Sequence, residues 1–279
     1  MMAEQAKQTS AEPDAADEGR ATNSTQKVCA ILRALSARSP QRLAEISAWT
    51  GLNKVTALRI LETLIEEGFA EREPDGRGFA RGPEFLALAA SAGRSHDLRE
   101  LARPSLVRLA ELSEDTALLS VRSGIESVCI DRQVGSFPIR ANYLDIGSRR
   151  PLGVGAGALA ILTWLPVREI DAILGVIGPH LGPYPRMSVD LIRELVLESR
   201  TRGCVVLLDR VVDRMSAIGV PILSETGAVI GALSIAALTE RISERAEMLC
   251  GALLRETDLI RREMGRGLAT SSRPKGSAS

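Results

Sequence analysis

The sequence has no excess of charge of either sign, because 35 lysine and arginine residues are balanced by 35 aspartate and glutamate residues. No field of the whole molecule draws it to nucleic acid, so any contact with DNA must come from a local patch. Long apolar runs are also missing, and a membrane span needs roughly 20 such residues. The N-terminal segment lacks the apolar stretch of a signal peptide. We therefore expect a cytoplasmic protein without a membrane partner.

Histidine is scarce as well. The chain has two, His96 and His180, and neither stands near a nucleophile motif such as Gly-x-Ser-x-Gly. No group of residues has the spacing of metal ligands. We therefore expect no catalytic residue, no metal and no cofactor, and an enzyme with a DNA-binding appendage stays an alternative.

Closely spaced cysteines are missing too. The four cysteines lie far apart, without the spacing that closes a zinc site or a redox dithiol: Cys29, Cys129, Cys204 and Cys250. Free cysteine is among the residue types most often buried, so we expect reduced, mostly buried thiols. A thiol-based redox-sensing regulator without an organic ligand stays a second alternative.

The 279 residues, 45% of them hydrophobic, are enough for two globular domains. Residues 1–23 and 267–279 are rich in small and polar residues without periodic apolar positions, so we expect disordered tails. Between the tails the patterns predict an α+β protein with two domains joined by a linker helix. The boundaries are 24–82 for the first domain, 83–97 for the linker and 98–266 for the second domain.

The first domain begins with three short helices. The first helix carries an apolar stripe at amphipathic spacing: Val28, Ile31, Leu32 and Leu35. A second helix runs from about Gln41 to Trp49, and Gly51 makes the following turn. Asn53 is a suitable N-cap for a third helix, which ends at Gly68. This order is typical of a helix-turn-helix.

The rest of the first domain predicts a wing. Residues 69–73 and 79–81 are two short β-rich runs around a Pro-Asp-Gly turn. The apolar, alanine-rich segment over 83–97 then predicts the linker helix. A winged helix-turn-helix is therefore expected over 24–82.

The third helix predicts a surface that reads double-stranded DNA. When Leu58, Leu61, Leu64 and Ile65 face the core, a step of about 100° per residue places four residues opposite: Val55, Thr56, Arg59 and Thr63. In the major groove, Arg59 can form two hydrogen bonds to a guanine. Further basic residues are suited to phosphates: Lys54 in the first turn, Arg42 on the second helix, and Arg77 and Arg81 in the wing.

The second domain mixes strands and helices. Expected strands cover 117–122 and 125–132 around a Ser-Gly turn, 137–143, 204–208, 217–223 and 229–238. Expected helices cover 98–112, a segment that starts within PLGVGAGALAILTW, 189–202 and 243–265. Strands in one sheet flanked by helices favour a pocket beside the sheet.

The glycine-rich run Gly153–Gly157 invites a phosphate-loop interpretation. It lacks the Lys-Ser/Thr ending of such a loop, and no clear strand feeds it. The N-terminus of a helix can nonetheless bind a carboxylate through free backbone N–H groups. We favour that role.

With these residues in place, the chain resembles the IclR family of transcriptional regulators from about Gln26 to Arg266. In the first domain the similar stretch is LAEISAWTGLNKVTALRILETLIEEGF, and in the second it covers 147–165, Arg202-Gly203 and 218–242. The resemblance implies a GAF-like effector-binding domain and a homodimer joined through the DNA-binding domains, paired into tetramers in some cases. It also implies a pseudo-palindromic operator, whose symmetry mirrors the protein's own axis.

The sequence departs from the family at the positions that hold small oxo-acids in some members. The matching residues here are Leu207, Ala217, Ser234 and Ala236, and only Ser234 keeps a polar group. Such a pocket cannot repay the desolvation of a small, highly polar acid. We therefore expect a larger, partly apolar effector such as an aromatic acid.

We place the pocket for this effector between the sheet, the Gly153–Gly157 segment and the strand that holds Ser234. The effector's carboxylate is expected at the backbone N–H groups of Gly155, Ala156 and Gly157, with Ser234 or Arg140 as a further partner. Tyr143 or Asn142 is expected at the entrance of the pocket.

Overall fold

A computed structural model of the chain describes residues 23–37, 39–91, 93–139 and 144–271. The chain divides into two compact units, Met1–Ala89 and Ala90–Ser279. Within the described ranges, every helix is too short or too polar to cross a membrane. The predicted tails lie outside the described residues over 1–22 and 272–279.

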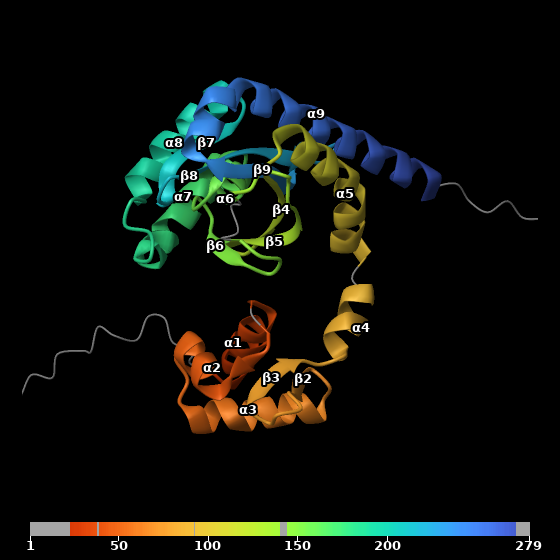
Figure 1. Cartoon of the computed structure of the whole chain (residues 1–279), viewed down its shortest axis with the longest axis vertical. Helices are drawn as coiled ribbons and strands as arrows, with labels where there is room; N and C mark the ends of the chain where they lie inside the picture. Colours follow the sequence, from red (N-terminus) through yellow and green to blue (C-terminus); the bar gives the residue numbers. More distant parts are fainter. Residues whose placement is uncertain (1–22, 38, 92, 140–143, 272–279) are drawn as a thin grey trace, which may run out of the picture. The chain divides into compact units, whose positions relative to one another are not determined.

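The N-terminal unit packs three helices against a small antiparallel sheet (Figure 1). Its elements are α1 (Ser24–Ala37), β1 (Gln41–Arg42), α2 (Leu43–Thr50), α3 (Lys54–Glu66), β2 (Ala70–Arg72) and β3 (Gly78–Arg81). The strand order is β1-β3-β2, so β1 adds to the hairpin of β2 and β3. Ile31, Ile46 and Leu61, one from each helix, are fully buried together. The predicted order of three helices and a two-stranded wing is confirmed.

The placement of Arg42 on the second helix is wrong. Gln41 and Arg42 form β1 and pair with Phe79 and Gly78 of β3, so α2 begins only at Leu43. The side chain of Gln41 is buried and its Nε2 donates to the carbonyl of Ala34 at 2.6 Å. This contact with α1 holds the backbone extended before the helix starts.

The extent of the linker helix also differs from the prediction over 83–97. Helix α4 spans Glu84–Ser91, and α5 spans Gly93–Ser113, which includes the end of the predicted linker and the whole helix predicted for 98–112. The continuity of α5 follows from its buried face, which carries apolar residues at helical spacing: Leu98, Ala102, Leu106 and Leu109.

The C-terminal unit is built on a six-stranded antiparallel sheet with the order β6-β5-β4-β9-β8-β7. The strands are β4 (Thr116–Ser123), β5 (Glu126–Gln133), β6 (Arg149–Pro151), β7 (Val205–Val212), β8 (Met215–Leu223) and β9 (Val229–Leu238). The helices after α5 are α6 (Ala156–Thr163), α7 (Val167–Ile177), the short 3₁₀ helix η1 (Gly178–Leu181), α8 (Val189–Arg202) and α9 (Thr239–Ser271).

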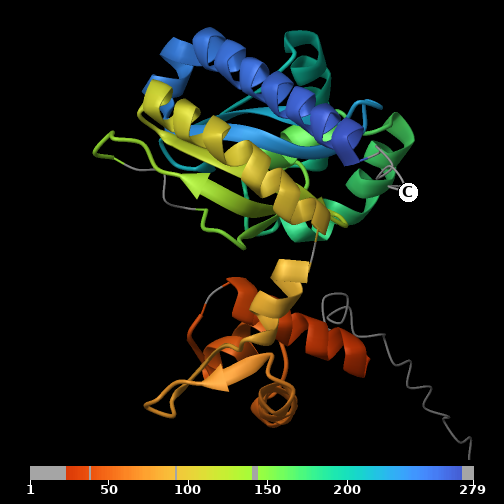
Figure 2. The same ribbon diagram turned by 90° about the vertical axis from the view of Figure 1, so that its right-hand side faces the viewer.

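Helices cover both faces of this sheet. Helices α5 and α9 lie side by side on one face (Figure 2), where Leu106 and Leu253 belong to one core. Helices α6, α7 and α8 contribute to a second core on the other face, with Leu159, Ile173 and Ile192 among its buried residues. The expected α+β architecture is confirmed.

The strand predicted over 137–143 is wrong in the part that the structure describes. Phe137, Pro138 and Ile139 form no strand, and residues 140–143 lie outside the described residues. The N–H of Phe137 donates to the carbonyl of Glu114 at 2.8 Å, and its ring lies under the guanidinium of Arg241 at 3.7 Å. Both contacts hold the segment away from the sheet, whose edge is formed by β6 instead.

The end of the last helix differs as well, because α9 continues to Ser271 and so covers 267–271 of the predicted tail. This helix is fixed to the sheet by an ion cluster around Asp115, whose side chain is 1% exposed. Its Oδ1 lies 3.0 Å from Nε of Arg241, and its Oδ2 lies 2.5 Å from Nη2 of Arg245. The same two arginines also donate to the carbonyl of Ser113.

Removing the carboxylate of this cluster is expected to destabilise the C-terminal unit. Asp115→Asn leaves Arg241 and Arg245 without their buried anion, and losing one member of a buried ion pair costs about 3 kcal/mol or more. Urea unfolding of the full chain measures the change. Asp258→Asn is the matched control, because Asp258 pairs with two arginines on an exposed part of α9 and should leave the stability nearly unchanged. Equal midpoints for both variants would contradict the assignment.

Candidate functional site

The turn between α2 and α3 and the start of α3 are as the sequence predicts. Gly51 ends α2 with a φ of 68°, which favours glycine, and Oδ1 of Asn53 accepts from the N–H of Thr56 at 2.9 Å. The buried face differs slightly from the prediction. Ala57, Leu61 and Leu64 are buried, whereas the predicted core residues Leu58 and Ile65 are only partly buried.

The opposite face of α3 presents most of the predicted DNA-contacting residues. Lys54, Arg59 and Thr63 are exposed, and Thr56 is half-buried. Val55 is 80% exposed beside them, although the core offers burial to apolar side chains elsewhere on the same helix. An exposed methyl-bearing side chain next to a guanidinium suits the edges of bases in the major groove, where thymine carries a methyl group.

The basic residues around the wing do not form one group. Arg42 pairs with Gly78 and therefore lies beside Arg77, which is exposed in the turn between β2 and β3. Arg81 lies at the other end of β3, where its N–H donates to Oγ of Ser39 at 3.2 Å. Arg42 and Arg77 therefore lie close together, and Arg81 lies apart from them at the other end of β3.

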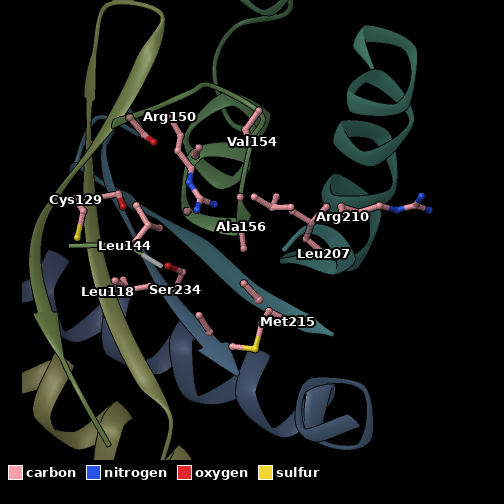
Figure 3. Close-up of a pocket in the computed structure, with 18 of the residues that line it drawn as sticks. Leu118, Cys129, Leu144, Arg150, Val154, Ala156, Leu207, Arg210, Met215 and Ser234 are labelled. Atoms are coloured by element: carbon pink, nitrogen blue, oxygen red, sulfur yellow. The ribbon is translucent and has the colours of Figure 1, made fainter. Parts of the chain in front are cut away.

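A cavity lies in the C-terminal unit between the sheet and the N-terminus of α6 (Figure 3). The predicted effector-binding residues that the structure describes all line it: Gly155, Ala156, Gly157, Leu207, Ala217, Ser234 and Ala236. The predicted residues Arg140, Asn142 and Tyr143 lie outside the described residues.

The register of the sheet explains why the residues on the strands meet. Ala217 of β8 pairs with Leu207 of β7 on one side and with Ala236 of β9 on the other, which gives an apolar row. Ser234 pairs with Leu118 of β4 two positions further along. Side chains two residues apart on a strand share a face, so these residues line one wall.

The glycines of the other wall make room for polar groups. A Cβ on Gly157 would lie 3.2 Å from Oγ of Ser120 and 3.3 Å from Oγ of Ser234. A Cβ on Gly155 would lie 3.2 Å from Nη1 of Arg150. The start of α6, where the first backbone N–H groups have no partner within the helix, thus lies against two hydroxyls and a guanidinium.

Sequence reasoning missed Arg150, Ser120, Ser127 and Cys129, which also line the cavity. Arg150 is 8% exposed and reaches from β6 toward Ala156 (Figure 3). Period-two alternation along β4 and β5 could have placed both serines beside Leu118 and Cys129. Arg150 could be found only if β6 had been recognised as a strand.

The cavity is small. The space between its atoms is about 520 Å³ with the open mouth included.

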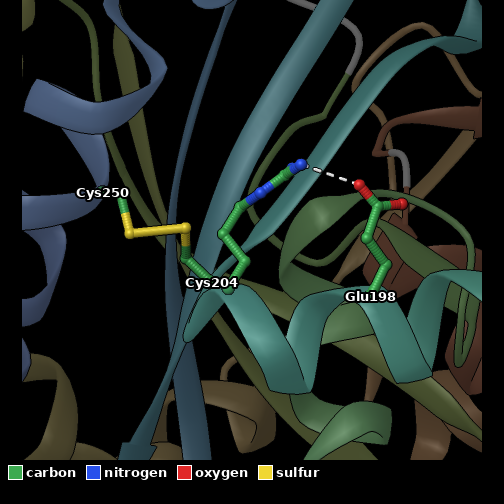
Figure 4. The surroundings of a disulfide bond; sticks show 4 residues. Glu198, Cys204 and Cys250 are labelled. Carbon is green, nitrogen blue, oxygen red and sulfur yellow. Dashed lines mark hydrogen bonds and ion pairs between the residues drawn. A yellow bond between two sulfur atoms is a disulfide. The ribbon is translucent and has the colours of Figure 1, made fainter.

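The prediction that the cysteines are reduced is wrong for two of them. Cys204, immediately before β7, and Cys250 of α9 form a disulfide, with their Cα atoms 6.2 Å apart (Figure 4). They are 46 residues apart in sequence, so local spacing could not reveal that the fold brings them together. Of the two free cysteines among the described residues, Cys29 is exposed.

Cys129 is the buried thiol among the described residues, and it lines the cavity. Burial raises the pKa of this thiol to about 12, so it is protonated at neutral pH. His180 is exposed on η1. Over the described ranges, His, Cys, Asp and Glu side chains form no group of three that could hold a metal ion.

Comparison with known protein families shows to which family the chain belongs. Residues 90–259 match the C-terminal domain of the bacterial transcriptional regulator IclR, and residues 24–74 match the IclR helix-turn-helix domain. The chain belongs to the IclR family. This IclR-family protein is therefore a DNA-binding transcriptional regulator with a C-terminal effector domain.

Named relatives agree with this assignment. The regulator is 27% identical over 219 residues to the HTH-type transcriptional regulator KipR of Bacillus subtilis, covering 78% of this chain and 87% of that protein. It is 28% identical to the HTH-type transcriptional regulator TtgV of Pseudomonas putida, covering 86% of this chain and 91% of that protein.

Solved structures share the fold. An IclR transcriptional regulator from Alicyclobacillus acidocaldarius matches with a TM-score of 0.70 and 25% identity over 85% of this chain and 97% of that one. An IclR homolog from Microbacterium hydrocarbonoxydans, complexed with 4-hydroxybenzoate, matches with a TM-score of 0.70 and 22% identity. That match covers 86% of this chain and 98% of the other.

Proposed function

We propose that this IclR-family regulator binds a carboxylic acid with an apolar, aromatic body in the cavity beside α6, and that binding changes its affinity for a pseudo-palindromic operator. The observation that carries the proposal is that the cavity has a polar part and an apolar part. Hydroxyl groups of Ser120 and Ser234 lie at the start of α6, and the row Leu207, Ala217 and Ala236 is apolar.

This division favours a ligand with one polar end. The N-terminus of a helix stabilises an anion through its free N–H groups and its dipole. A small oxo-acid carries a carbonyl oxygen besides its carboxylate, and this oxygen loses its hydrogen bonds to water on binding. The apolar row has no donor that could replace them, so a small oxo-acid is disfavoured. The relative complexed with 4-hydroxybenzoate makes an aromatic acid a suitable first probe.

On the DNA side, α3 is the proposed recognition helix and two copies of the regulator bind one operator. A single winged module buries too little surface for tight specific binding, so a dimer is needed. Helix α4, at the end of the N-terminal unit, carries Leu86, which is 75% exposed, and Leu88, which is 54% exposed. These side chains support a dimer joined at the DNA-binding domains, alone or paired into tetramers.

A second candidate function is redox sensing, and the disulfide between Cys204 and Cys250 favours it. A peroxide would oxidise the two thiols: the sulfur–sulfur bond forms, two protons and two electrons pass to the peroxide, and two water molecules or their equivalents leave. The bond ties α9 to β7, so its reduction frees α9 from one of its attachments to the sheet.

Arg59→Ala and Lys54→Ala test the DNA-binding surface. Arg59→Ala is expected to cost about 1–3 kcal/mol and to relax the preference at one base pair of each half-site. Lys54→Ala is expected to weaken all sequences alike and to reduce the dependence on salt. The operator is selected from a random pool of duplexes, and titration of this duplex measures the affinity of both variants. The same titration is expected to give two protomers per site. Equal loss of specific and random binding in Arg59→Ala would show that Arg59 reads no base.

Ala236→Phe tests the cavity, because Ala236 is 1% exposed in its apolar row and a ring there fills the space of the ligand. The wild type is expected to bind aromatic acids in a calorimetric screen against aliphatic and oxo-acids. The variant is expected to lose this binding and to keep its operator affinity. Tight binding of glyoxylate or pyruvate without an aromatic hit would contradict the proposal.

The redox candidate is tested by operator affinity with dithiothreitol and with hydrogen peroxide. If redox sensing holds, the wild type responds, the double variant Cys204→Ser with Cys250→Ser does not, and Cys29→Ser with Cys129→Ser responds as the wild type does. The same wild-type affinity in both conditions would end this candidate.

A further inference from the structure

Arg150 is the charged side chain of the cavity wall that turns inward. It sits on β6, opposite Ser127 of β5, and both residues line the cavity. Its neighbour Arg149 turns to the other side, where Nη1 lies 2.8 Å from Oε2 of Glu126 and 3.3 Å from Oγ of Ser123. Alternation along a strand therefore assigns the two adjacent arginines to different surroundings.

The wall of the cavity favours negative charge. Among the described residues that line it, two are arginines and none is acidic. The second arginine, Arg210, is exposed and points away from the cavity in Figure 3. Carboxylates on the neighbouring segments are engaged elsewhere, since Glu126 pairs with Arg149 and Asp131 pairs with Arg103. Arg150 is thus the buried cationic side chain among the described residues that line the cavity.

The guanidinium also converges with the start of α6. Nη1 of Arg150 packs against the backbone of Gly155, where a Cβ would lie 3.2 Å from it. Hydroxyls of Ser120 and Ser234, residues that are 6% and 4% exposed, face the next glycine, Gly157. Neither hydroxyl makes a hydrogen bond to another residue that the structure describes.

We propose that Arg150 selects carboxylates in this cavity. Its guanidinium binds the carboxylate of the ligand together with the first N–H groups of α6 and the hydroxyl of Ser234. The body of the ligand then packs against Leu118, Leu207 and Ala236. A guanidinium forms two parallel hydrogen bonds to a carboxylate and only weak ones to a neutral amide, so Arg150 determines the charge of the ligand. This inference rests on the proposed ligand-binding function and names the residue that makes it specific for acids.

The test compares acids with their neutral amides on the full chain by calorimetry. The probes are benzoate and benzamide, and hexanoate and hexanamide. The variants are Arg150→Met, which removes the charge at similar length, Arg150→Lys, which keeps the charge without the planar fork, and Arg149→Met as the control on the same strand. Thermal unfolding and operator binding without ligand show whether each variant is folded.

The wild type and Arg149→Met are expected to bind an acid at least about tenfold more tightly than its amide. In Arg150→Met the acid loses this advantage while the amide is unaffected, and Arg150→Lys falls between the two. If Arg150→Met is unfolded, the role of Arg150 is tested by the same comparison of acid and amide with Arg150→Lys.

The outcomes separate the inference from the proposed function. If benzoate binds equally well to Arg150→Met and to the wild type, the proposed function stands and the role of Arg150 is wrong. If hexanoate alone binds and requires Arg150, the role of Arg150 stands and the aromatic ligand is wrong. Equal binding of acids and amides to the wild type, or no binding of any probe, overturns the inference.

Discussion

The close contact between α6 and the sheet is the constraint on which the rest of the C-terminal unit depends. A Cβ on Gly219 of β8 would lie 2.7 Å from the carbonyl oxygen of Ala156, so only glycine lets the helix approach this far. All eight residues of α6 are buried, and its first residues are small. A helix this close to the sheet leaves no room for long side chains at its N-terminus. The space in front of it is therefore left to hydroxyls, backbone N–H groups and the guanidinium of Arg150.

The sequence predicts the elements whose ends are marked by local chemistry. Helix α8 spans Val189–Arg202 as expected, because Oγ of Ser188 accepts from the N–H of Leu191 and Gly203 takes a φ of 81° after the last turn. Strands with long apolar patterns, such as β9, are also found where they are predicted. In each case the signal lies within a few residues of the element that it specifies.

The predictions fail where contacts between residues far apart in sequence determine the secondary structure. Strand β6 is three residues long and reads Arg-Arg-Pro, which carries no β pattern, and it exists because β5 offers an edge to pair with. Gln41 and Arg42 form a strand because β3 offers its edge, although the sequence there reads as the start of a helix. Helix α7 was not predicted at all, although Ile170, Ile173, Leu174 and Ile177 bury one face of it at helical spacing.

The same distinction applies to the site. Four residues could be assigned to one cavity because the resemblance to the IclR family matches them to effector-binding positions: Leu207, Ala217, Ser234 and Ala236. Arg150 has no such motif, and its inward direction follows only from the register of Ser127 with β6. The fold thus places in the cavity a charged side chain that the sequence analysis did not assign to it.

The disulfide between Cys204 and Cys250 encloses three of the strands that line the cavity. Strands β7, β8 and β9 all lie between the two cysteines, together with the first turns of α9. A protease that cuts the chain once in this segment therefore yields two fragments that stay linked until a reductant separates them. This part of the cavity wall thus stays attached to the protein after a single backbone break, and it does so only as long as the surroundings remain oxidising.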